Sequence, residues 1–298
     1  MFYREAGSGH AVVLVHQILR TSLDYRFVMP LLAERYRVIA FDIAGCGDSD
    51  APPRPYSIED HAAAVATAMD NMGLRDAAIV GHHSGANIAL ELCVQRPDLA
   101  RSTALSGLFY VNDREQLEEL YAKALKLQDP EPRPDGSHLL ALWQEGLWTN
   151  WGKPRLPAER LDLLGDFFLE QVKTGPRRFE PYVAQMKYDT AARLPLLGKP
   201  CLFISASDDV FMCSATDLWR RDQPAGLFVR IEVHGGGEMP RLYPAEWAAA
   251  IIHFLADDEY PAFPPAAGQS QAHAVRIGGE WHPVGALPKI APGPGKSE

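Results

Sequence analysis

The stretch Gly81-His82-His83-Ser84-Gly85 follows a short apolar run and precedes a segment whose apolar residues recur at helical spacing. This strand–turn–helix context is typical of a nucleophile elbow, a sharp turn that presents one reactive side chain. Small residues two positions before and after the tip let strand and helix approach each other. Counted from His83 both positions are glycine, whereas counted from Ser84 the first is His82. The spacing therefore predicts His83 at the tip.

An imidazole at this tip implies different chemistry from a hydroxyl. A serine hydroxyl becomes a nucleophile only when an adjacent imidazole removes its proton. An imidazole facing a carboxylate is instead a competent general acid or base, because the negative charge stabilises its protonated form. His83 is therefore expected to move protons and to need a carboxylate partner.

Four landmarks occur in order along the chain and carry a resemblance to a known family. They are His16 after a buried strand, the glycine-containing segment 41–49, the elbow, and Ser207-Asp208-Asp209-Val210. The chain resembles the α/β-hydrolase superfamily, in its capped, esterase and C–C-hydrolase-like branch, from about residue 2 to about 256. The resemblance implies an α/β fold with a mostly parallel sheet flanked by helices and an inserted helical cap.

The same resemblance implies the domain organisation. Residues 1–108 and 195–256 would form the α/β-hydrolase core, and residues 109–194 the helical cap. Residues 257–298 lie outside the resemblance as a Pro/Gly-rich C-terminal extension, and 274–283 reads as a small hairpin with Gly-Gly at its turn. An independent core is not expected in this extension.

The family's serine, acid and histidine positions correspond here to His83, Asp209 and Glu238. Two of the three residue types therefore depart from the family. We expect a His83–Glu238 pair supported by Asp209. His83 either acts as a general base or attacks a carbonyl to form an acyl-imidazole. The first route is favoured because a neighbouring carboxylate favours the imidazolium, which is not a nucleophile.

Further residues are expected around this pair by the same resemblance. The N–H of Ser84 at a helix N-terminus, with an N–H near Gln17 or Ile18, would hold a developing oxyanion. His16 is expected chiefly as a buried imidazole bonded to backbone. In the cap, at least one indole is expected at the wall of an apolar pocket, from the set Trp143, Trp148 and Trp151.

The amino-acid composition and net charge limit which binding partners and cellular locations are expected. With 298 residues and 47% hydrophobic side chains the chain can bury a substantial core. A net charge of −9 without clustered Lys or Arg argues against nucleic acid as a partner. No stretch has the length and apolarity of a membrane span or leader, and the scattered cysteines read as reduced thiols, so a cytoplasmic location is expected. No cofactor is expected, and a homodimer is left open.

Several elements are predicted from local signals. Apolar spacing predicts a helix over Ser22 to Arg35 and a strand over Thr103 to Leu108. Ser57 and Asp60 have the spacing of a capping box at the start of a helix that stops at Gly73.

The sequence thus favours an enzyme that hydrolyses an ester, lactone or C–C bond in a small, largely apolar carbonyl compound. A lyase or decarboxylase and a non-catalytic ligand-binding pseudo-hydrolase remain alternatives. A metal site is a weaker reading, because no ligand spacing is diagnostic; its ligands would be His16, His82, His83, Asp209 and Glu238.

Overall fold

The computed structural model describes residues 1–111, 113–126, 131–144, 162–206, 227–231, 238–256, 274–277 and 280–283. Within these ranges no helix combines the length and apolarity needed to cross a membrane. Asp209, Trp148 and Trp151 lie outside the described residues.

The centre of the described structure is a seven-stranded sheet in the order β1-β3-β2-β4-β5-β6-β7. All neighbouring pairs are parallel except β1 and β3, which are antiparallel. The strands are β1 (Tyr3–Ala6), β2 (Ala11–Val15), β3 (Arg37–Phe41), β4 (Ala77–His82), β5 (Ala100–Ser106), β6 (Cys201–Ala206) and β7 (Leu227–Ile231). Because parallel strands need crossover connections, helices cover both faces of the sheet.

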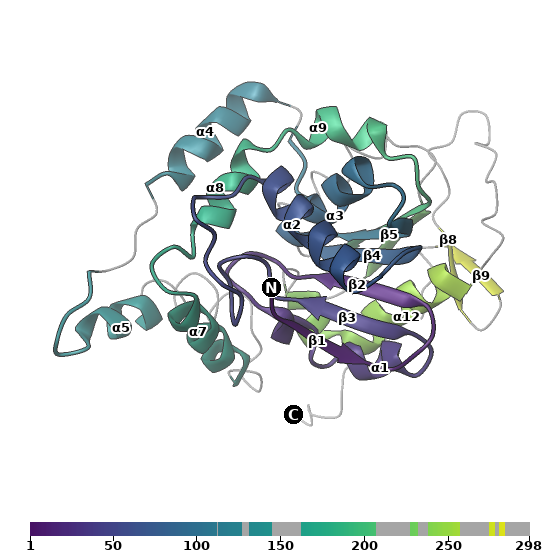
Figure 1. Ribbon diagram of the computed structural model, residues 1–298, viewed down its shortest axis with the longest axis horizontal. Coiled ribbons are helices and arrows are strands. Elements are labelled where there is room, and N and C mark those ends of the chain that lie inside the picture. Colours follow the sequence, from purple (N-terminus) through teal and green to yellow (C-terminus); the bar gives the residue numbers. More distant parts are fainter. Residues whose placement is uncertain are drawn as a thin grey trace, which may run out of the picture.

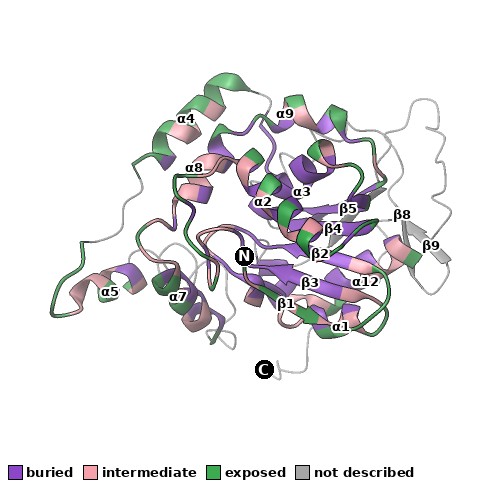
Figure 2. Ribbon diagram, viewed as in Figure 1, coloured by how far each residue is buried: buried purple, intermediate pink, exposed green. Residues whose placement is uncertain are grey.

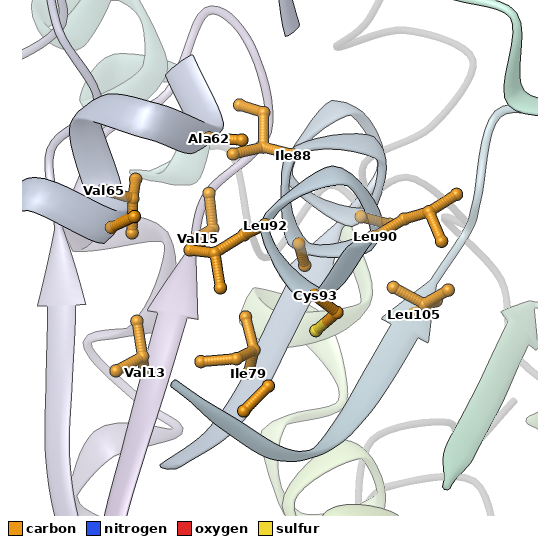
Figure 3. Close-up of a cluster of buried hydrophobic side chains, with 14 of the residues drawn as sticks. Val13, Val15, Ala62, Val65, Ile79, Ile88, Leu90, Leu92, Cys93 and Leu105 are labelled. Carbon is orange, nitrogen blue, oxygen red and sulfur yellow. The ribbon is translucent and has the colours of Figure 1, made fainter. Parts of the chain in front are cut away.

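Side chains from alternate positions of each strand pack on opposite faces. One face packs against α2 (Ile58–Asn71) and α3 (Ser84–Gln95), as Figure 3 shows for Val13, Ile79 and Leu92. The other face packs against α1 (Met29–Ala33) and α12 (Pro244–Ala256), where Trp247 is fully buried. The central strands are almost wholly buried (Figure 2).

Between β5 and β6 the chain forms helices instead of βα units (Figure 1). They are α4 (Arg114–Ala124), α5 (Ser137–Ala141), α7 (Asp162–Thr174), α8 (Glu180–Lys187) and α9 (Thr190–Arg193). Buried polar contacts join this insertion to α3: Gln185 donates to Asn87 at 2.9 Å, and Tyr188 donates to Glu91 at 2.8 Å. α7 docks at the end of the molecule where the loop after β2 lies, through contacts described below.

One local prediction is wrong, and another has the right element with different bounds. The segment from Ser22 to Arg35 is not one helix but a 3₁₀ turn (Ser22–Tyr25) followed by α1. Pro30 lacks the N–H that a helix interior needs, so the α-helix begins beside it, at Met29. β5 starts at Ala100 and ends at Ser106, because Gly107 adopts φ 59°, which is incompatible with an extended strand.

Other local predictions are confirmed. Ser57 and Asp60 form a reciprocal capping box at the start of α2, and Gly73 has φ 66° just beyond its end. The hairpin is present as β8 (Ala274–Ile277) paired antiparallel with β9 (Glu280–Pro283).

Candidate active site

The backbone at the β4–α3 turn is strained at His83, which has φ 49° and ψ −117°. A β-carbon at Gly81 would lie 2.1 Å from the carbonyl oxygen of Gly85. A β-carbon at Gly85 would lie 2.0 Å from the carbonyl oxygen of Val15. Only glycine fits at either position, so strand and helix approach as the sequence predicts, with the strained conformation at His83 and not at Ser84.

The imidazole of His83 lies against the chain that leaves β5. A β-carbon placed on Gly107 would be 2.5 Å from Cδ2 of His83 and 2.9 Å from its Nε2. The backbone N–H of His83 donates to the carbonyl of Ser106 at 2.7 Å, which fixes the tip to the same strand end. The half-buried ring therefore occupies the space that a side chain at position 107 would take.

Ser84 is turned into the body of the protein. It is fully buried, and its Oγ accepts a hydrogen bond of 2.7 Å from the backbone N–H of Ile18. That bond ties the start of α3 to the loop after β2. It also engages the N–H of Ile18, so the N–H of Ser84, at this helix N-terminus, and an N–H near Gln17 remain the expected oxyanion donors.

His16 has both ring nitrogens engaged with backbone. Its Nε2 accepts from the N–H of Ile43 at 3.0 Å, so its Nδ1 carries the proton and donates to the carbonyl of Gln17 at 2.7 Å. Both side chains are buried. This pairing holds the loop after β2 against the end of β3 and leaves His16 no lone pair for a metal.

His82 faces the opposite side of the sheet from α3. Its Nδ1 lies 3.0 Å from Oγ of Ser106, which also accepts from the indole N–H of Trp247 at 3.0 Å. The ring is completely buried between the sheet and α12. In the part of the chain that the structure describes, no three His, Cys, Asp or Glu side chains are grouped to hold a metal ion.

Trp143 is the one member of the predicted indole set within the described residues. It packs edge-on against Phe168 of α7, with ring centroids 5.5 Å apart. It also joins a small apolar cluster with Leu19 and Phe167. This cluster, which includes the indole, links the insertion to the loop that carries Gln17 and Ile18.

Glu238 is 2% exposed and precedes the short helix α11 (Met239–Leu242). Its Oε1 accepts from Nη2 of Arg20 at 2.5 Å. Its Oε2 is buried and has no hydrogen-bond partner among the described residues. Glu238, the expected partner of His83, is thus a buried carboxylate, and one of its oxygens is paired with Arg20.

This pair belongs to a buried network of five charged residues. Glu170 of α7 bridges Arg20, at 3.4 Å, and Arg241, at 2.7 and 2.8 Å, and Arg241 also donates to Asp24 at 2.9 Å. All five side chains are at most 4% exposed. Burial by itself would raise the pKa of Asp24, but attraction to Arg241 and Arg20 lowers it below its usual value.

Known proteins resemble this chain in sequence and in structure. The α/β hydrolase fold family matches residues 10–129. A soluble epoxide hydrolase of Corynebacterium sp. is 33% identical over 99 residues, 33% of this chain and 35% of the relative. A 2-(acetamidomethylene)succinate hydrolase of Mesorhizobium japonicum is 32% identical over 120 residues, 40% of this chain and 43% of the relative. The match thus spans less than half the length of either relative.

Solved structures extend the likeness beyond the N-terminal part. The enol-lactonase from Burkholderia xenovorans superposes with a TM-score of 0.70 at 18% identity, covering 86% of this chain and 96% of that one. An esterase from Thermogutta terrifontis gives a TM-score of 0.69 at 20% identity, covering 86% and 92%. This protein has the α/β-hydrolase fold.

Four charged residues of this network were not predicted from the sequence: Arg20, Asp24, Glu170 and Arg241. Arg20 stands in a loop of mixed composition, and Glu170 lies one helical turn after Phe167 on the inward face of α7. A charge on the apolar face of an amphipathic helix signals a buried pair, but it does not say which of several cations it meets.

Proposed function

We propose that this protein hydrolyses an ester, lactone or C–C bond in a small, largely apolar carbonyl compound, with His83 and Glu238 as its acid/base pair. The observation that carries the proposal is the elbow itself. His83 has the strained tip conformation, while the hydroxyl of Ser84 is buried and bonded to the N–H of Ile18. The chain's relatives include proteins named as hydrolases, which supports the same reaction class.

The proposed mechanism uses general base catalysis. Neutral His83 takes a proton from water as the oxygen attacks the carbonyl carbon, and the imidazolium returns that proton to the leaving group. Glu238 stabilises the imidazolium, with Asp209 in support. The N–H of Ser84, at the start of α3, stabilises the oxyanion.

The helical insertion, residues 109–194, is proposed as the cap that covers this site. Trp143 supports the assignment, because it packs on the same apolar cluster as Leu19, which lies in the loop that follows β2. An apolar cap would favour substrates without charge and would exclude bulk water from the pair.

The test combines a serine-directed probe with turnover of ester, lactone and β-diketone panels. A fluorophosphonate is expected to leave the protein unlabelled, whereas labelling at Ser84 would contradict the proposal. His83→Ala and Glu238→Gln should each lower kcat by roughly 100-fold or more, with exposed His10→Ala as the matched control. His83→Ser should stay inactive, and only His83→Ser with Glu238→His places an imidazole opposite a hydroxyl.

Two other outcomes would replace this proposal. Proton abstraction by the same pair without incorporation of solvent oxygen would make the protein a lyase or decarboxylase, and product analysis in ¹⁸O-water distinguishes these cases. Tight ligand binding with no turnover in any panel would make it a non-catalytic binder.

A further inference from the structure

We propose that Arg20 is a positioning residue for Glu238 and that helix α7 of the insertion holds Arg20 in place. The inference rests on the proposed function, in which Glu238 is the partner of His83. It adds a residue that acts on the site through the carboxylate and makes docking of α7 a condition for a correctly oriented pair.

The guanidinium of Arg20 contacts the carboxylate of Glu238 directly. Nη2 of Arg20 reaches only Oε1 of Glu238, at 2.5 Å, and the buried Oε2 has no hydrogen-bond partner among the described residues. A buried carboxylate without a cation carries a large desolvation cost. Arg20 offsets that cost and fixes the plane of the carboxylate, so that Oε2 remains the acceptor for an imidazole or water.

Arg20 is itself held in place by two residues of α7. Its Cζ lies 3.4 Å from the ring centroid of Phe167, and its Nη1 lies 3.4 Å from Oε2 of Glu170. Phe167 and Glu170 are three residues apart on α7, so they present one ring and one carboxylate on the same helix face. A planar guanidinium can stack on the ring and contact both carboxylates at once, which an ammonium cannot.

Glu170 is held in turn by hydrogen bonds from two other residues. Nη2 of Arg241 donates to both of its oxygens, and Oγ1 of Thr21 donates to Oε1 at 2.7 Å. Both partners belong to the α/β body, so the Glu170 carboxylate joins α7 to the body at this buried site. The chain of contacts therefore runs from the body to α7, then to Arg20, and finally to Glu238.

The structural test needs no substrate. Crystal structures of Arg20→Met and Arg20→Lys are compared with Arg26→Met, the matched control, because Arg26 pairs with Asp166 of α7 without contacting Glu238. The Glu238 carboxylate should leave its wild-type orientation in Arg20→Met, shift less in Arg20→Lys, and stay unchanged in Arg26→Met. An unchanged carboxylate in Arg20→Met, or in Arg20→Lys if the first variant does not fold, would overturn the proposal.

The kinetic test uses whichever panel substrate is turned over. Arg20→Met should lower kcat by about 10- to 100-fold with KM changed by less than about threefold, since a misplaced group costs transition-state stabilisation rather than binding. In the Glu238→Gln background the same substitution should cause no further loss. A further loss there would overturn the positioning role. Full activity of Glu238→Gln alone would instead refute the catalytic pair, and the positioning role with it.

Discussion

At the residue scale, the contact between Gly107 and the His83 ring makes a sharp prediction. Gly107→Ala should destabilise the protein by about 1–3 kcal/mol more than Gly73→Ala, because both glycines have a positive φ but only the first has a ring in its Cβ position. Urea unfolding measures both. In a His83→Ala background the two costs should become equal, and a persistent difference would place the clash elsewhere.

His61 of α2 predicts a pH dependence of stability. Burial lowers the pKa of His61 from 6.5 to about 4. Between these values the unfolded chain binds the proton and the folded protein does not, so stability falls as the pH is lowered. The loss should reach about 2–3 kcal/mol by pH 4.5.

The control for this effect is His61→Phe, which keeps a ring beside Tyr56 but cannot titrate. Unfolding free energies at pH 7.5 and 4.5 should differ less in this variant than in the wild type. Equal differences would show that His61 does not carry the effect.

The strained tip was predictable from the sequence, because the elbow's steric demand selects glycine at two fixed positions beside His83. The partner of Glu238 was not predictable in this way. Arg20 meets Glu238 across 218 residues, and its choice depends on how α7 docks. Local spacing carries no information about that packing.

At the element scale, the capping box of α2 is the clearest local device. Ser57→Ala removes the acceptor for the N–H of Asp60 and should cost about 1 kcal/mol of stability. Thr67→Ala, an exposed position within the same helix, serves as the control and should change stability by less than about 0.5 kcal/mol. Thermal unfolding measured on both variants checks the difference, and an equal effect would count against the cap.

Elements with a strong local signal were predicted well, and those decided by tertiary packing were not. The capping box marks where α2 begins, and the apolar run of β6 marks where that strand begins and ends. The segment around Pro30 keeps helical apolar spacing, yet proline interrupts its hydrogen bonding, so periodicity alone overstated its length.

At the scale of the whole molecule, the buried thiols report on global unfolding. Burial raises the pKa of Cys46 and Cys93 to about 12, and Cys201 is also buried. In a Cys213→Ser variant these three thiols should stay unmodified by iodoacetamide at pH 8 until denaturant unfolds the chain. Mass mapping of the alkylated peptides checks this, and fast alkylation of Cys46 in the native protein would contradict the burial.

The five-residue charged network also affects how the protein unfolds. Its members come from the segment after β2, from α7 and from the start of α11, so detaching α7 alone would break the ion pairs of Glu170 with Arg20 and with Arg241. That cost suppresses partial opening of the insertion. Hydrogen exchange should therefore find amides of α7 opening together with those of β2 and α12, in one cooperative event. The insertion would then not open locally by itself, and its amides would exchange only when the whole protein unfolds.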